Sequence, residues 1–519
     1  MLMQMGGVPG WDDAAHVYKV FLLRTGQSVF WDNYWYGGSY GAITYGVVFY
    51  WLAQAVPAKL MAVLAAGALP PLFYVYQRDL WGLDDIWPAW LFAATMAVYL
   101  AHGQDPFVLA LALTVGGLAL LARRHPIWAA LPVAVGIFTN PMALVACGVL
   151  ALADVLSRPA VRRRYAVCLT AVAPALVARL LLGWAFNEPG DYLNETSQLL
   201  VYLSFALAGV ALAGISAVHP PRPFVILFGT YAALCLTSFV TPGSPLGNNI
   251  GRFFMVFGLP LLALLRHSRL RRPFPGADLV LVPIALFAVL QIGTPIAHFL
   301  NQAERPQTRP SFFAPALAAA GELRDRDHRL HVVALRRHWE AFYFPEAGFP
   351  VTRGWYRQAD AIHNSLFYTT YDASAYVPWL RAMGVRYVFL ADAALDPWSR
   401  REVQILHTSP EFSVERRVAG WTVYELRASA PLAVGTDGGT AHISAWGHRD
   451  LSVTVDRPGR YLVKVSWSPY WSLEGGPGRL RRGPGRFTLL EAERAGVYTL
   501  RLAVTPGAVI GQVLARAGL

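Results

Sequence analysis

The feature that most constrains this chain is a series of long apolar segments, all within the first 300 of its 519 residues. Eight of them are long enough, or nearly so, to cross a hydrocarbon layer of ~30 Å as helices that rise 1.5 Å per residue. They span residues 58–77, 86–102, 106–122, 165–186, 199–217, 223–241, 252–266 and 277–297. Two shorter runs, 126–138 and 141–157, flank Thr139-Asn140-Pro141 and predict a broken pair that returns to the side from which it enters. We therefore expect a polytopic α-helical membrane domain of about 10 membrane segments over residues 45–299.

The composition agrees with this prediction. Hydrophobic residues make up 55% and charged residues 15%, whereas soluble chains have about 25% charged residues. An ordinary soluble enzyme, a disordered protein and a disulfide scaffold are thereby excluded. The three cysteines lie in apolar runs, where they are typical packing residues.

Beyond residue 300 the pattern changes to that of a water-exposed protein. Residues 300–428 alternate predicted helices with short strands such as 330–335 and 385–390, and this predicts an α/β domain. Residues 429–519 show alternating apolar residues between Gly and Pro turns, which predict a β-sandwich. In the clearest strand, 461–467, the odd positions are apolar and Lys464 and Ser466 lie on the other face.

Arginine sets the predicted orientation in the plasma or inner membrane. The loops 78–85, 123–125, 158–164, 219–222 and 266–272 are rich in arginine, and the positive-inside rule places them in the cytoplasm. Residues 1–44 and the domains after residue 300 are then extracytoplasmic. The net charge of +12 is explained by these loops, so nucleic acid is not an expected partner. Because residues 1–44 lie outside, we also expect a first membrane helix ahead of the given start.

The predicted outer loops contain the candidate site residues. Asp12, Asp13 and His16 open an amphipathic helix in residues 1–44, with Val17, Val20, Phe21 and Leu23 facing the membrane interface. Asp12 and His16 share one helix face. The alternative is that Asp12 caps the helix and Asp13 stabilises its N-terminus. A divalent cation between the three is conceivable, but their spacing does not require one.

A second group combines aromatic and polar side chains. Asp32, Tyr34 and Trp35 suit a sugar, whose apolar face stacks on a ring while its hydroxyls form hydrogen bonds, although an interfacial aromatic belt is the alternative. Four more polar residues lie in predicted outer loops: His102, Gln104, Asp105 and Asn249.

Two arginines lie in or at the edge of apolar segments, where a charge needs a partner or a watery cavity. Arg252 begins one helix just below the outer surface, and Arg179 lies in the outer half of another. A lipid phosphate would be a suitable partner. The alternatives are an ion pair with an outer carboxylate or an extended side chain that reaches the interface.

Several short motifs carry a resemblance to a known family. The chain resembles the GT-C superfamily of integral membrane glycosyltransferases and is most similar to the branch called 6-pyruvoyl-tetrahydropterin-synthase-related membrane proteins. The motifs are Asp12-Asp13 with His16, Tyr34-Trp35-Tyr36-Gly37-Gly38, Tyr45-Gly46-Val47-Val48-Phe49-Tyr50, Gly103-Gln104-Asp105-Pro106-Phe107, Asn248-Asn249-Ile250-Gly251-Arg252-Phe253 and Gly384-Val385-Arg386-Tyr387-Val388-Phe389-Leu390.

The resemblance implies an enzyme that moves a sugar, with inversion, from a polyprenyl-phosphate donor to an extracytoplasmic glycan or lipid acceptor. It implies a catalytic Asp in the first outer loop, here Asp12 or Asp13, with Asp105 as a possible second carboxylate. Arg252, Arg179 and His16 are then candidates for the donor phosphate. A membrane-embedded transporter and a non-catalytic scaffold that binds glycans through Trp467, Tyr470 and Trp471 are the alternatives.

Overall fold

The computed structural model describes residues 10–27, 30–40, 46–186, 195–215, 222–241, 247–266, 281–293, 296–297, 306–323 and 325–516. The chain divides into two compact units. Unit 1 comprises the described residues within 1–11, 45–182 and 189–304, and unit 2 those within 12–44, 183–188 and 305–519.

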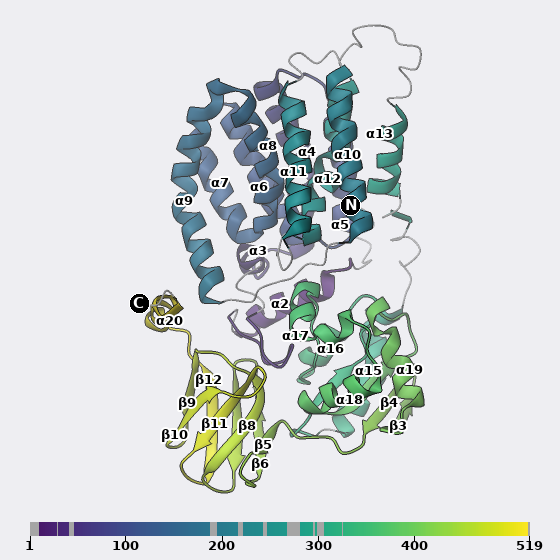
Figure 1. The fold of residues 1–519 in the computed structure, drawn as a ribbon, viewed down its shortest axis with the longest axis vertical. Coiled ribbons are helices and arrows are strands. Elements are labelled where there is room, and N and C mark those ends of the chain that lie inside the picture. Colours follow the sequence, from purple (N-terminus) through teal and green to yellow (C-terminus); the bar gives the residue numbers. More distant parts are fainter. Residues whose placement is uncertain are drawn as a thin grey trace. The chain divides into compact units, whose positions relative to one another are not determined.

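Unit 1 is a bundle of apolar helices that stand side by side (Figure 1). Their cores coincide with the apolar runs, because a backbone in hydrocarbon satisfies its polar groups within a helix. After the short α3 (Val47–Leu52) come α4 (Ala58–Tyr76), α5 (Trp87–Ala101), α6 (Asp105–Ala122), α7 (Pro126–Thr139), α8 (Pro141–Ser157), α9 (Arg162–Ala185), α10 (Thr196–Ile215), α11 (Arg222–Val240), α12 (Gly251–Arg266) and α13 (Leu281–Ala288).

Five described helical segments are long and apolar enough to cross a membrane: Ala58–Trp81, Asp105–Ala122, Pro159–Ala185, Thr196–Gly214 and Arg222–Val240. Several shorter apolar helices accompany them. The chain is therefore an integral membrane protein. The number of crossings and the side on which each loop lies remain predictions.

The break predicted at Thr139-Asn140-Pro141 is present. Asn140 is extended (φ −163°, ψ 109°) and separates α7 from α8. Its side-chain oxygen accepts a hydrogen bond from the Met142 backbone N–H at 3.0 Å, which caps α8. Pro141 takes the first helical position, where its missing N–H costs no hydrogen bond.

The first part of unit 2 is a four-stranded sheet with helices on both faces. The strands are β1 (Arg329–Val332), β2 (Val385–Ala391), β3 (Phe412–Val418) and β4 (Trp421–Leu426), in the order β1-β2-β4-β3, with only β1 and β2 parallel. Alternate side chains of β2 enter two different hydrophobic cores. Tyr387 and Phe389 belong to one core, and Val388 and Leu390 belong to the other. The helices are α2 (Asp13–Arg24), α15 (Pro310–Glu322), α16 (Glu340–Glu346), α17 (Arg357–His363), α18 (Ala373–Ala382) and α19 (Arg400–Thr408).

Helix α2 belongs to the hydrophobic core of this α/β part, together with the segment that follows it. It packs against α16 and buries Ala14, Ala15, Tyr18 and Leu22. Val20, which was expected at the membrane interface, is also buried, whereas Val17 is 40% exposed. A helix whose apolar residues are spread around its axis has no single face for a membrane, and here several of its sides are covered by protein.

The last part of unit 2 is a sandwich of two antiparallel sheets, as the alternation predicts. One sheet contains β5 (Ala433–Gly435), β8 (Gly459–Ser466), β10 (Gly478–Arg482) and β11 (Phe487–Ala492), and the other β6 (Ala441–Trp446), β7 (Asp450–Val455), β9 (Trp471–Glu474) and β12 (Gly496–Leu502). Helix α20 (Pro506–Arg516) follows. Lys464 is buried on the second face of β8, where its ammonium donates to Arg381 O at 2.6 Å.

Candidate functional site

Asp12 and Asp13 have different surroundings at the start of α2. Asp12 is the N-cap residue, although its side chain does not form the cap hydrogen bond. Its Oδ1 accepts a hydrogen bond from Trp355 Nε1 at 3.2 Å, and it is partly exposed. Asp13 and His16 are 5% and 3% exposed. A carboxylate that takes a proton from a substrate must be accessible, so Asp12 is the better placed of the pair.

Asp12 is connected through Trp355 to a group of buried polar side chains. The sequence alone did not reveal this group. The His338 ring stacks on Trp355 with centroids 3.6 Å apart, and Trp355 in turn binds Asp12. His338 also contacts Asp396 (3.2 Å) and Glu340 (3.3 Å). Burial alone would lower the pKa of His338, but these two carboxylates outweigh it and raise the pKa. His338 has φ 53°, a conformation that no motif in the sequence signals.

Asp32, Tyr34 and Trp35 are buried among protein atoms. Asp32 accepts hydrogen bonds from Tyr18 Oη (2.8 Å), His448 Nδ1 (3.0 Å) and the Tyr34 N–H (3.1 Å). Burial alone would raise the pKa of Asp32, yet His448 and the nearby Lys19 charge outweigh it and lower the pKa.

Trp35 stacks on Tyr18 and donates to Ala341 O at 2.8 Å. These contacts give the 31–36 segment a structural role, and substrate binding by its three candidate residues remains a prediction.

In unit 1, three of the predicted site residues meet at the start of α12. Arg252 Nη1 donates to Gln104 Oε1 at 2.8 Å, and its Nε donates to Asn249 Oδ1 at 2.9 Å. The guanidinium carbon lies 4.5 Å from the centre of the Phe107 ring. Arg252 forms no ion pair with any carboxylate among the residues that the structure describes. In the described part of the chain, its charge is therefore held by neutral groups.

Of the remaining candidates of unit 1, His102 ends α5 and Asp105 begins α6, whereas Arg179 belongs to another helix. Asp105 is buried and forms an ion pair with Lys59 at 2.8 Å. His102 contacts Val98 O through Nδ1 at 2.8 Å, within its own helix. Arg179 is in α9, at the edge of the bundle remote from α10 and α13 (Figure 1), whereas α12 packs against those two helices. The structure thus does not bring Arg179 to Arg252.

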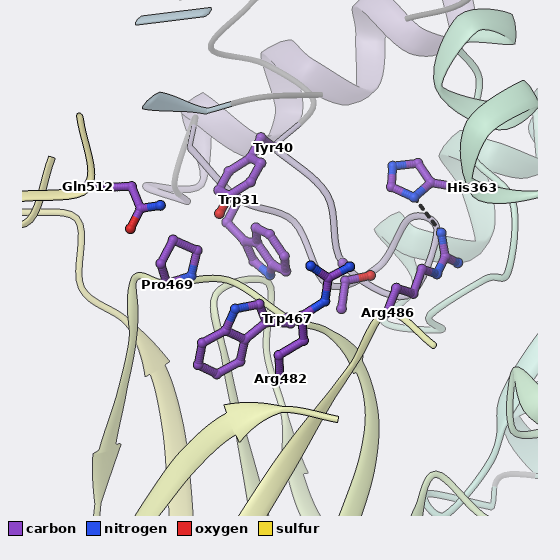
Figure 2. A pocket seen from close by; sticks show the side chains of 10 residues that line it. Trp31, Tyr40, His363, Trp467, Pro469, Arg482, Arg486 and Gln512 are labelled. Atoms are coloured by element: carbon purple, nitrogen blue, oxygen red, sulfur yellow. Dashed lines mark hydrogen bonds between the residues drawn. The ribbon is translucent and has the colours of Figure 1, made fainter. Parts of the chain in front are cut away.

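Unit 2 also contains a hollow of about 400 Å³, which we call the Trp31 pocket (Figure 2). It is lined by Trp31, Gly38, Tyr40, His363, Ser466, Trp467, Pro469, Arg482, Arg486 and Gln512. Of the three rings predicted as a sugar platform, Tyr470 and Trp471 are buried, while Trp467 is partly exposed and lines this pocket.

Metal binding finds no support in the described part of the chain. No group of three or more His, Cys, Asp or Glu side chains in that part is arranged to hold an ion. Asp12, Asp13 and His16 accordingly do not form a three-ligand site.

The fold defines a class of protein: an integral membrane helix bundle in one unit and, in the other, an α/β part with a β-sandwich. A solved structure similar to this chain is the single-particle cryo-EM structure of arabinofuranosyltransferase AftD from Mycobacteria, with 14% sequence identity and a TM-score of 0.45. The match covers 92% of this chain and 54% of that one, so the chain spans about half the length of AftD. No family model and no curated protein matches this sequence.

Proposed function

We propose that the chain is a membrane glycosyltransferase of the GT-C type. It would move a sugar from a polyprenyl-phosphate donor to a glycan or lipid acceptor at the extracytoplasmic membrane face. The acceptor oxygen forms a bond to the anomeric carbon while the bond from that carbon to the phosphate oxygen breaks. The acceptor proton passes to a carboxylate, the polyprenyl phosphate leaves with the electron pair, and the single displacement inverts the anomeric centre.

The observation that carries the proposal is that Arg252 has no carboxylate partner among the residues that the structure describes. The first turn of a helix already bears partial positive charge, so an arginine there is unfavourable unless an anion binds nearby. Gln104 and Asn249 orient the guanidinium through neutral oxygens and leave its charge available. A guanidinium held in this way suits a phosphate, both in the bound donor and as the charge develops on the leaving group.

Asp12 is the preferred base, and Asp13 is the alternative. An acceptor hydroxyl is a weak nucleophile, and a carboxylate that accepts its proton also favours the positive charge of an oxocarbenium-like transition state. The Trp355 hydrogen bond fixes one carboxylate oxygen of Asp12, and the residue is partly exposed.

The test is sugar transfer from radiolabelled polyprenyl-phosphate sugars in membranes that contain the wild type, Asp12→Asn, Asp13→Asn or Arg252→Ala. We expect Asp12→Asn to lower transfer by about 100-fold or more, because a positioned base contributes on that order. Arg252→Ala should lower transfer strongly, and Arg252→Lys should restore part of it, since lysine keeps the charge without the two-pronged geometry.

Arg222→Ala is the matched control for Arg252→Ala. It removes an exposed arginine from the first position of another apolar helix, α11, and should leave transfer unchanged. Transfer that is indifferent to both Asp changes would contradict the catalytic assignment. Coupled movement of a lipid across vesicles, without sugar transfer, would favour a transporter instead.

A further inference from the structure

The Trp31 pocket combines aromatic and arginine side chains. Aromatic rings come from the 31–40 segment and from the loop after β8, and Trp31, Tyr40 and Trp467 stand around one hollow (Figure 2). Arg482, the last residue of β10, and Arg486, just before β11, line the same pocket. Rings suit the apolar face of a sugar, and guanidinium groups suit a carboxylate or phosphate.

The two arginines are not equivalent. Arg486 is tied to the protein, because it donates to Tyr36 O at 2.7 Å and contacts His363 Nδ1. Arg482 is exposed, and its guanidinium forms no ion pair with the described residues. Arg481, its neighbour on the opposite face of β10, is paired with Glu491 at 3.2 Å. Arg482 is therefore the cation of the pocket that is available to a ligand.

Ser466 supplies an independent sign that the pocket is built for a polar ligand. Its side chain is 7% exposed, and its buried Oγ has no hydrogen-bond partner among the described residues. A buried hydroxyl without a partner costs about 1–3 kcal/mol. Because Ser466 lines the pocket, a polar ligand there offers this hydroxyl a partner.

Gly38 lets the Trp31 ring lie close against the backbone beside the pocket. It has φ 112°, and a Cβ there would lie 2.5 Å from that ring. The hollow of about 400 Å³ falls within the size range of small-molecule sites, about 300–1,000 Å³.

We propose that the Trp31 pocket binds a sugar residue bearing an acidic group, with Trp467 against the ring and Arg482 on the anion. The pocket shares no residue with the contacts of Arg252, and its occupancy does not depend on transfer activity. A soluble acidic glycan and a glycosyl phosphate offer the same chemistry, so the test includes both.

The experiment is ligand binding to the full chain in detergent, measured by calorimetry. The first probe is a tetrasaccharide that contains glucuronic acid. The second probe is its neutral counterpart, the same tetrasaccharide after carboxyl reduction. The third probe is glucose 1-phosphate. We expect the neutral counterpart to bind about tenfold more weakly than the acidic one, since a charge-assisted hydrogen bond is lost. Binding of glucose 1-phosphate in place of the glucuronate probe would support the site and identify phosphate as its anion.

Three variants assign the contacts. Arg482→Ala should weaken binding of the anionic probe about tenfold and leave the neutral one unchanged. Trp467→Ala should weaken both, and Trp467→Phe should restore most of the affinity. Arg479→Ala is the matched control, because it removes an exposed arginine from the other face of β10. This variant should bind the probes like the wild type. Equal binding of the acidic and neutral tetrasaccharides without binding of glucose 1-phosphate, or no binding of any probe, would overturn the proposal.

Discussion

At the residue scale, the sequence identified Arg252 and two of its partners but not the reason for their importance. Gln104 and Asn249 lie in separate polar loops, and only the fold brings both oxygens to one guanidinium. The group of His338, Trp355 and Asp396 could not be predicted. Its members are widely spaced in the sequence, and they meet because β1, β2 and the loops after them converge.

The amide of Gln104 permits a test that changes charge without changing shape. Gln104→Glu would place a carboxylate where Oε1 now lies, 2.8 Å from Arg252 Nη1. This internal anion would compete with the donor phosphate, and we expect the donor KM to rise about tenfold. Gln54→Glu, which adds the same charge elsewhere in unit 1, is the control. An unchanged donor KM in Gln104→Glu would show that Arg252 does not hold the phosphate.

His338 makes the stability of unit 2 depend on pH. The raised pKa of His338 means that the folded state favours the protonated ring. The contribution of His338 to the free energy of unfolding is thus fully present below the unfolded-state pKa of 6.5. It is lost as the pH rises through the pKa of the folded state. We expect the difference in melting temperature between the wild type and His338→Gln to shrink from about pH 6 to about pH 9.

The exposed His407 provides the control for this pH series, because His407→Gln should give a small difference at every pH. A gap between the wild type and His338→Gln that widens with rising pH would contradict the assigned protonation.

At the scale of elements, the apolar runs predicted the helices well because hydrocarbon leaves the backbone few alternatives. How the helices pack was not predictable, since close approach depends on small residues at particular positions. Gly209 of α10 is such a position, because a Cβ there would lie 2.3 Å from the buried ring of Phe228 in α11. Gly214, in the same helix, has open space around it.

These two glycines form a matched pair for a stability test. Gly209→Ala should destabilise the bundle by about 1–3 kcal/mol, because the ring and helix must move to admit the methyl group. Gly214→Ala should be neutral or slightly stabilising, since alanine favours a helix by up to about 1 kcal/mol. Thermal unfolding of both variants in detergent measures the difference. Equal melting temperatures would mean that α10 and α11 do not pack through Gly209.

At the scale of the whole molecule, composition and charge predicted a helical membrane part followed by α/β and β-rich parts. The domain boundaries drawn from the sequence set residues 1–44 apart from residues 300–428. In the structure residues 12–44 share a compact unit with residues 305–519. Local patterns do not contain this information, because it resides in contacts such as the Trp35–Ala341 hydrogen bond, whose partners are 306 residues apart.

The predicted location of unit 2 outside the cell can be tested with introduced cysteines. The three native cysteines are buried, so their background labelling should be low. Ala495→Cys lies on an exposed turn between β11 and β12 and should react with an impermeant maleimide in intact cells. Ala160→Cys lies in a predicted cytoplasmic loop and should react only after permeabilisation. The opposite pattern would place unit 2 in the cytoplasm.

The division into units determines when contacts can form during synthesis. The chain passes between the two units five times, so residues 12–44 emerge from the ribosome long before their partners. At about 5–20 residues per second, the 306 residues between Trp35 and Ala341 take roughly 15–60 s to make. During that interval the core residues Tyr18, Trp35 and Tyr36 lack their partners from residues 313–423. The contact between this early, aromatic segment and its partner therefore forms only after residue 341 of the 519 has been made.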